Sequence, residues 1–178
     1  LVNNAGVSLQ GSILDNDTAA IERLVTVNIT APTLLTAAAA KVFKARDKGG
    51  IVNIASVLAL VPEMFDGIYS GSKAHLVNIT LGLANQLKGS KVRAQAVLPG
   101  ATRSEIWEKS GKDVDALLPG KVMETADLVD AALLGYDRGE VVTIPTLHED
   151  GHYRIYDQAR LIMAPLLANK DVAPRYRA

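Results

Sequence analysis

Four short apolar runs alternate with longer segments of helical pattern along this chain. The runs cover residues 1–4, 51–55, 92–98 and 140–144, and the middle two are rich in Val, Ile, Leu and Ala. Apolar runs of this length, without polar alternation, are typical of strands that are covered on both faces. We therefore predict four strands, with the middle two buried in a sheet.

Helical segments fill the intervals between these runs. We expect helices over residues 18–48, 68–88, 124–138 and 152–168, with Pro165 as a kink or stop in the last one. Asp17 or Thr18 is suited to cap the first helix, because its side-chain oxygen accepts a bond from a free backbone N–H. Residues 169–178 are expected to form a loop or flexible arm within a single domain that spans residues 1–178.

The alternation of strands and helices predicts an α/β fold, a doubly wound parallel sheet with right-handed crossovers. In open sheets of this kind, the active site lies beyond the C-terminal ends of the strands. We therefore expect the residues that follow Asn4, Ala55 and Leu98 to converge on one edge of the sheet.

Tyr69 and Lys73 lie four residues apart at the start of the second helix, so they share one of its faces. A nearby ammonium favours the phenolate and lowers the tyrosine pKa from about 10, which suits an acid–base tyrosine. A Tyr-x-x-x-Lys pair is also common on ordinary helix surfaces. Ser56 ends the second strand, where its hydroxyl can hydrogen-bond a substrate carbonyl. Taken alone, Ser56 is equally a turn or helix-cap serine.

Asn28 lies inside the first long helix, although asparagine is a mediocre helix former. Its carbonyl or amide is placed to hold a water beneath Lys73. The alternative is a buried asparagine that neighbouring backbone satisfies. Small-residue turns also follow two strands, Asn-Asn-Ala-Gly at 3–6 and Pro-Gly-Ala-Thr at 99–102. Glycine in such turns lets the backbone approach a ligand closely, although each turn by itself is an ordinary strand end.

Together these pieces resemble the short-chain dehydrogenases/reductases, in the shorter branch of that superfamily. The resemblance rests, in family order and spacing, on Asn-Asn-Ala-Gly at 3–6, Asn28, Ser56, Tyr-Ser-Gly-Ser-Lys at 69–73 and Pro-Gly at 99–100. It covers residue 1 to about residue 145 and implies a Rossmann-like fold. In the family's strand order 3-2-1-4-5-6-7, this chain holds strands 4 to 7 with their flanking helices.

The resemblance implies an oxidoreductase that uses NAD or NADP to interconvert a secondary alcohol and a ketone. Tyr69 would be the general acid in reduction and the base in oxidation, and Lys73 would lower its pKa. Ser56 would polarise the carbonyl, and Asn28 would hold a relay water. The same resemblance implies cofactor binding by Asn4, Ala5, Gly6, Tyr69, Lys73, Pro99, Gly100 and Thr102. The hydride itself belongs to the cofactor.

One family feature has no counterpart here, the Gly-rich turn that cradles the cofactor pyrophosphate at a helix N-terminus. The chain also opens without Met, inside the first strand, so we expect a fragment or a partly observed protein. An alternative function is a truncated, inactive module that keeps only an oligomerisation role. The resemblance implies homodimers or homotetramers built through helices 18–48 and 68–88. A third possibility, an epimerase or dehydratase with the same Tyr–Lys pair, is disfavoured by the turn at 3–6 and the short C-terminal part.

Composition narrows the choice of partners and location. Lys plus Arg and Asp plus Glu both number 19, which leaves no basic excess for nucleic acid or anionic lipid. The absence of cysteine agrees with a cytoplasmic location. We expect no stretch that is apolar enough to span a bilayer. Residues 148–152 fit H-E-x-x-H, but Gly151 interrupts the helical face that a zinc site requires, so we expect no metal site.

Overall fold

The computed structural model describes residues 1–11, 13–109 and 113–177. It forms two compact units, Leu1–Thr146 (unit 1) and Leu147–Ala178 (unit 2), where the sequence predicts one domain over residues 1–178. Unit 1 contains the sheet and all the site residues that the sequence suggests.

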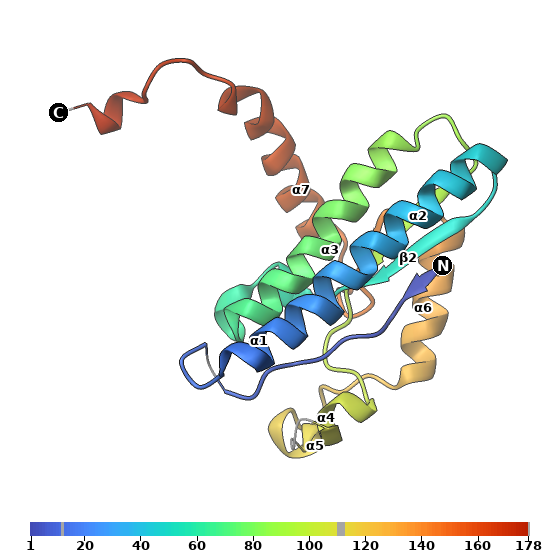
Figure 1. The fold of residues 1–178 in the computed structure, drawn as a ribbon, viewed down its shortest axis with the longest axis vertical. Coiled ribbons are helices and arrows are strands. Elements are labelled where there is room, and N and C mark those ends of the chain that lie inside the picture. The colour runs from blue at the N-terminus through green and yellow to red at the C-terminus, as the bar shows by residue number, and fades with distance from the viewer. Residues whose placement is uncertain (12, 110–112, 178) are drawn as a thin grey trace. The chain divides into compact units, whose positions relative to one another are not determined.

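Four parallel strands form the sheet of unit 1, in the order β1–β2–β3–β4. Figure 1 shows β2 beside the strand at the N-terminus. The strands are β1 Val2–Asn3, β2 Gly50–Ile54, β3 Arg93–Val97 and β4 Val142–Thr143. Each strand lies within two residues of the bounds expected from the apolar runs. Because the order matches strands 4 to 7 of a doubly wound sheet, the predicted fold class is confirmed.

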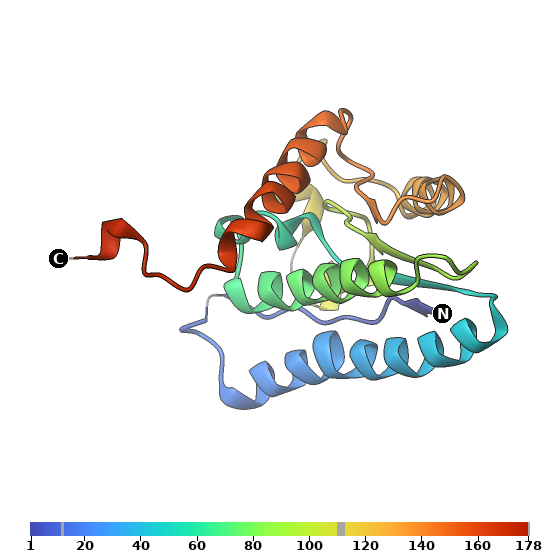
Figure 2. The same ribbon diagram turned by 90° about the horizontal axis from the view of Figure 1, so that it is seen from above.

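Helices cover both faces of this sheet. They are α1 Thr18–Val25, the π-helical turn η1 Thr26–Thr30, α2 Ala31–Arg46, α3 Gly67–Gln86, α4 Glu105–Lys109, α5 Val114–Leu117 and α6 Thr125–Asp137. Two 3-10 turns follow β2, η2 Val57–Ala59 and η3 Pro62–Met64. Helices α2 and α3 lie on one face of the sheet and α6 lies on the other (Figures 1 and 2). Asp17 caps α1 as predicted, since its Oδ1 accepts from Ala20 N at 2.8 Å.

The first long helix is continuous from Thr18 to Arg46 but contains the π turn η1 in its middle. Its buried side chains, among them Leu24, Asn28 and Thr36, form the face that packs on β2 and α3. Within the described residues, it is also the one helix that by length and composition could cross a membrane, since an 18-residue window in it reaches a mean hydropathy of 1.2. The expectation that no stretch reaches this length and hydropathy is therefore wrong.

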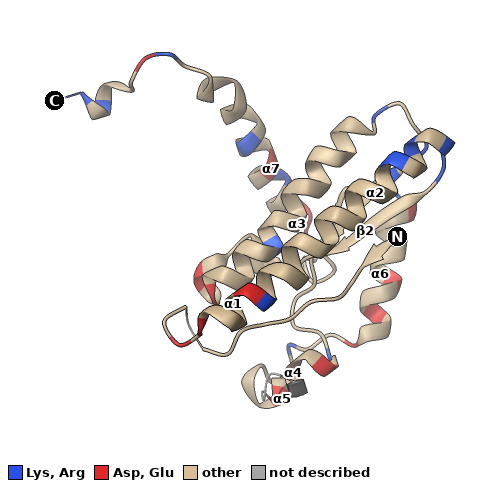
Figure 3. Ribbon diagram, viewed as in Figure 1, with Lys and Arg blue, Asp and Glu red and all other residues tan. Residues whose placement is uncertain are grey.

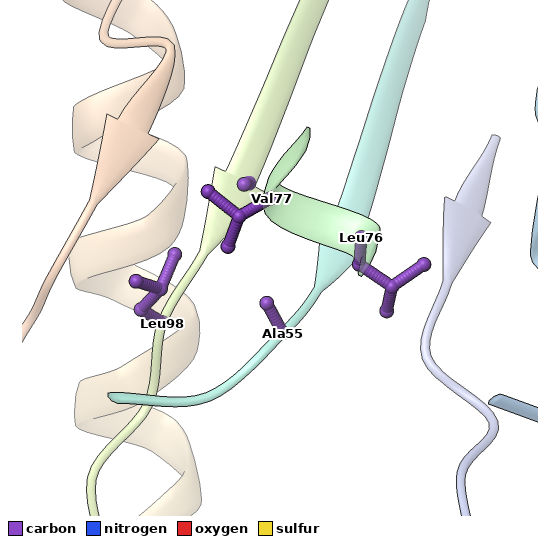
Figure 4. Packing of buried hydrophobic residues seen from close by; sticks show 5 residues of the cluster. Ala55, Leu76, Val77 and Leu98 are labelled. Carbon is purple, nitrogen blue, oxygen red and sulfur yellow. The ribbon is translucent and has the colours of Figure 1, made fainter. Parts of the chain in front are cut away.

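An apolar cluster fills the space between α3 and the C-terminal ends of strands β2 and β3 (Figure 4). Its fully or nearly fully buried members are Ala55, Leu76, Val77, Ala96 and Leu98. Full burial of one leucine side chain contributes about 2 kcal/mol. On the opposite face, α6 approaches β4 so closely that a Cβ on Gly135 would collide with Thr143 Oγ1. Packing on both sides therefore holds the strand ends rigidly.

Unit 2 contains α7, Gly151–Met163, and the 3-10 turns η4 Ala164–Leu167 and η5 Pro174–Tyr176. The regular helix gives way to η4 just before Pro165, which agrees with the predicted kink or stop. Because α7 begins at Gly151, His148 precedes the helix and does not share a helical face with His152. Throughout the described chain, acidic and basic residues are scattered over the elements (Figure 3).

Candidate active site

Three strand ends meet at one edge of the sheet, as the fold class predicts. Ala55 N donates to Val97 O at 2.7 Å, so β2 and β3 stay paired to their ends. The turn after β1 reaches the same edge, because a Cβ on Gly6 would lie 3.3 Å from Lys73 Nζ. The residues proposed for chemistry from separate parts of the sequence are thus brought together.

The start of α3 places Tyr69 at this edge. Asp66 caps the helix, with Oδ1 accepting from Ile68 N at 3.2 Å and Oδ2 from Tyr69 N at 2.9 Å. This cap is needed because Gly67 and Gly71 weaken the first turns of the helix. Sequence reasoning missed Asp66, although an aspartate three residues before Tyr69 at a helix start is a recognisable cap signal.

Ser56 lies at the end of β2, close enough to the side chain of Tyr69 to act on the pKa of its phenol. Its Oγ also accepts from Leu58 N at 3.2 Å and so caps η2. The turn-cap interpretation is therefore confirmed, and the role of Ser56 at a substrate carbonyl stays a prediction.

Burial dominates the titration of Tyr69 and Lys73. It raises the pKa of Tyr69 to about 12, and the hydrogen bond from Ser56 offsets only part of that rise. It lowers the pKa of Lys73 to about 8. The prediction of a lowered Tyr69 pKa is therefore wrong for this structure, because the lost hydration of the phenolate is the largest contribution to its pKa.

Lys73 is held beneath the tyrosine by two contacts. Its Nζ donates to Ile54 O at 2.9 Å and lies 5.6 Å from the centroid of the Tyr69 ring. An ammonium has three N–H donors. Within the described part of the chain, Nζ donates to one acceptor, Ile54 O. Two donors therefore stay available to a bound group.

Asn28 is the buried, backbone-satisfied asparagine that the sequence left open as an alternative. Its side chain is 1% exposed, and its Oδ1 accepts from Val7 N at 2.9 Å. Its Nδ2 donates to Val7 O at 2.8 Å and to Ser72 Oγ at 3.1 Å. These bonds tie η1 to the turn after β1 and to α3. The water that Asn28 would hold beneath Lys73 stays a prediction.

The residues expected to bind a cofactor follow β1 and β3. Five of them are exposed or half-buried at the edge: Asn4, Ala5, Gly6, Pro99 and Gly100. Thr102 differs, because its Oγ1 donates to Gly100 O at 3.2 Å and its backbone forms a bridge with Met123. Its hydroxyl is therefore engaged within its own turn. The cofactor role of all these residues stays a prediction.

Arg103, which sequence reasoning missed, fastens the segment that follows β3. Its guanidinium donates to both Asp115 oxygens, at 2.6 and 2.9 Å, and to Glu124 Oε1 at 3.0 Å. Trp107 Nε1 donates to Thr102 O at 2.8 Å in the same segment. These bonds tie the short helices α4 and α5 to the segment that follows β3.

Comparison with known proteins gives consistent matches along this chain. Residues 1–115 match the short chain dehydrogenase family. The chain is 33% identical over 160 residues to the 3alpha-hydroxysteroid dehydrogenase of Mediterraneibacter gnavus, covering 86% of this chain and 64% of that protein. It is 33% identical over 162 residues to the L-xylulose reductase of Caenorhabditis elegans, with the same two shares.

A solved structure agrees with these sequence matches. The short-chain dehydrogenase from Sphingobium yanoikuyae in complex with NADPH superposes with a TM-score of 0.93 at 43% identity. The superposition covers 99% of this chain and 68% of that chain. This chain spans slightly less than two thirds of the length of the two curated relatives described above.

Proposed function

We propose that this chain, which belongs to the short-chain dehydrogenase family, carries the catalytic residues of an NAD- or NADP-dependent oxidoreductase. The reaction is the interconversion of a secondary alcohol and a ketone. The observation that carries the proposal is the buried ammonium of Lys73, whose Nζ lies 5.6 Å from the centroid of the Tyr69 ring, with Ser56 close enough to the phenol to lower its pKa. Relatives named as a hydroxysteroid dehydrogenase and a xylulose reductase support the same reaction class.

Tyr69 is the proton donor in the direction of reduction. With a pKa of about 12 it is protonated at neutral pH, so its phenol is ready to protonate the carbonyl oxygen. The Ser56 hydroxyl, which lies beside the phenol, holds the same carbonyl oxygen in place. In the reverse direction the phenolate takes the alcohol proton. The raised pKa makes that phenolate rare at neutral pH, so the rate of alcohol oxidation is expected to increase with pH.

The residues at this edge fit a nicotinamide cofactor. The two free N–H donors of Lys73 suit the paired hydroxyls of a ribose. Bare backbone at Gly6 leaves room beside Lys73 Nζ that a Cβ would fill. A bound nicotinamide supplies or accepts the hydride, and the protein supplies position and electrostatics. The proposal covers NAD and NADP alike. The water on Asn28 belongs to the same proposal, as a proton path from Lys73 to solvent.

Self-association is the second part of the proposal. The helix from Thr18 to Arg46 has four exposed apolar side chains: Val25, Leu34, Leu35 and Val42. Exposed apolar surface of this kind is typical of an interface. We propose a homodimer or homotetramer that forms through this helix and α3, in the cytoplasm. An inactive assembly module, the alternative function, would use the same surface and would leave NAD(P)H fluorescence unchanged.

Replacing Tyr69 by Phe tests the proposed chemistry. We expect Tyr69→Phe to lower kcat for ketone reduction on the order of 10³-fold, because the proton donor is lost. Binding of NAD(P)H, measured by its fluorescence, stays within about twofold, because removal of one hydroxyl leaves Lys73 in place. Tyr156→Phe, at an exposed tyrosine of α7, is the matched control and keeps wild-type turnover. Turnover near normal in Tyr69→Phe contradicts the assigned role.

A further inference from the structure

Two buried serines flank the same turn of α3 and differ in their hydrogen bonds. Ser70 and Ser72 are each 1% exposed. The Ser70 hydroxyl has no hydrogen-bond partner within the described residues. The Ser72 hydroxyl donates to Tyr69 O at 2.7 Å and accepts from Asn28 Nδ2 at 3.1 Å. Since a hydroxyl has one proton, that proton is committed to the Tyr69 carbonyl and the oxygen to Asn28.

The bond from Ser72 completes the set that fixes the Asn28 carboxamide. Asn28 Oδ1 faces Val7 N, and one Nδ2 proton faces Val7 O. A flipped amide would place oxygen against oxygen and nitrogen against nitrogen, so only one orientation is satisfied. Ser72 takes the second Nδ2 proton, which would otherwise be buried without an acceptor.

This arrangement joins three segments of unit 1 at one point. Ser72 belongs to α3, Asn28 to η1, and Val7 to the turn that follows β1. Ser72 and Asn28 lie 44 residues apart in sequence. Gly6 precedes Val7, and a Cβ on it would lie 3.5 Å from Asn28 Oδ1 and 3.3 Å from Lys73 Nζ. The position of the turn relative to Tyr69 and Lys73 therefore depends on the bond between Ser72 and Asn28.

We propose that Ser72 is a positioning residue for the oxidoreductase reaction, an inference that rests on the proposed function. Its hydroxyl sets the turn after β1 against the face of α3 that carries Tyr69 and Lys73. It acts through the Tyr69 carbonyl and the Asn28 carboxamide, and it touches neither the substrate nor the reacting atoms.

Ser72→Ala tests this role, and Ser70→Ala is its matched control. Both changes remove one buried hydroxyl from the same helix. We expect Ser72→Ala to lower kcat about tenfold, because small displacements of reacting groups are costly. Ser70→Ala removes an unpartnered hydroxyl and is expected to keep the wild-type kcat.

Thr80→Val separates positioning from a general loss of stability. Thr80 lies further along α3, its Oγ1 donates to Leu76 O at 2.7 Å, and it accepts from Asn53 Nδ2 at 2.9 Å. It therefore has the same donor and acceptor pattern as Ser72, but about 16 Å from Tyr69 along the helix. A merely structural effect would lower kcat equally in both variants, whereas positioning predicts near-normal kcat in Thr80→Val.

A second readout does not need activity. Exchange of the Asn28 side-chain amide protons with solvent, followed by NMR, is expected to be slow in the wild type, in Ser70→Ala and in Thr80→Val. It is expected to become faster in Ser72→Ala. The inference is overturned if Asn28 exchange is unchanged in Ser72→Ala, or if its kcat equals that of Thr80→Val. If the wild-type protein shows no oxidoreductase turnover, the proposed function fails, and the exchange result still decides whether Ser72 fixes Asn28.

Discussion

Lys73 is a charged side chain with 4% of its surface exposed, and a carbonyl and an aromatic ring, not a carboxylate, surround it. These contacts replace only part of the hydration that the ammonium loses on folding. The pKa of Lys73 therefore falls to about 8, and the folded protein carries a cation there that it releases readily. Burial of this ammonium therefore lowers the free energy of unfolding by an amount that depends on pH.

Burial of Lys73 predicts that stability rises with pH above neutrality. The ordinary pKa of lysine is 10.5, so between about pH 8 and pH 10 the unfolded chain binds a proton that the folded chain has lost. The free energy of unfolding should rise by about 2 kcal/mol across this window. Above pH 10 the raised pKa of Tyr69 acts in the opposite sense, because the unfolded tyrosine then ionises first. Urea unfolding at a series of pH values measures the rise.

The matched variants for this experiment are Lys73→Met and Lys41→Met. Lys73→Met removes the titrating group, so its stability should be flat between pH 8 and pH 10. Lys41 is exposed on α2, and Lys41→Met should keep the wild-type slope. A wild-type profile without any rise in this window would contradict the burial argument.

At the scale of residues, the sequence predicts which side chains meet but not how they titrate. Ser56, Tyr69 and Lys73 were found because strand ends and one helix face are set by local pattern. The predicted direction of the Tyr69 pKa shift was wrong, because the pKa depends on how deeply the folded chain buries the phenol. The bond between Asn28 and Ser72 joins residues that no periodicity relates, so only the folded chain reveals it.

At the scale of elements, a buried polar chain joins β1, β2, α2 and α3. Asn3 Nδ2 donates to Asn53 Oδ1 at 2.7 Å and to Thr36 Oγ1 at 3.0 Å. Asn53 Nδ2 donates to Thr80 Oγ1 at 2.9 Å, and Asn53 has no exposed surface. Such a network fixes which elements face each other, because each member is satisfied only in this arrangement.

Asn53→Leu is expected to destabilise the protein by about 3 kcal/mol, since it leaves one Nδ2 proton of Asn3 buried without its acceptor and removes the bond to Thr80 Oγ1. Chemical denaturation measures the loss. Asn78→Leu is the control on α3, where the side chain is exposed, and it should change stability by less than about 0.5 kcal/mol. Equal effects of the two substitutions would show that the network contributes nothing beyond apolar packing.

The strands and the long helices were predictable, and the short helices and the π turn were not. The four strands and the long helices follow from apolar periodicity and from caps such as Asp17. The π turn at Thr26–Thr30 contains no Gly or Pro, although Pro32 follows it at the start of α2. The helices α4 and α5 are too short to show a period, and α5 is tied to Arg103 by the ion pair with Asp115.

At the scale of the whole molecule, apolar surface is left uncovered on two helices that lie on opposite faces of the sheet. Leu34 of α2 is 65% exposed, and Leu133 of α6 is 59% exposed. Exposed apolar side chains make both helices candidates for a contact between copies of the chain. The assembly proposed above uses the helix from Thr18 to Arg46, which contains Leu34, and not α6.

Leu34→Glu is therefore expected to dissociate the oligomer, because a carboxylate buried in an apolar contact loses its hydration without gaining a partner. A penalty of about 3 kcal/mol raises the dissociation constant roughly 100-fold. Size-exclusion chromatography with light scattering should then give a lower mass at micromolar concentration. Leu133→Glu places the same charge on α6 and should leave the mass unchanged. If Leu133→Glu dissociates the protein and Leu34→Glu does not, the copies meet through α6, and the helix from Thr18 to Arg46 needs another explanation for its apolar side.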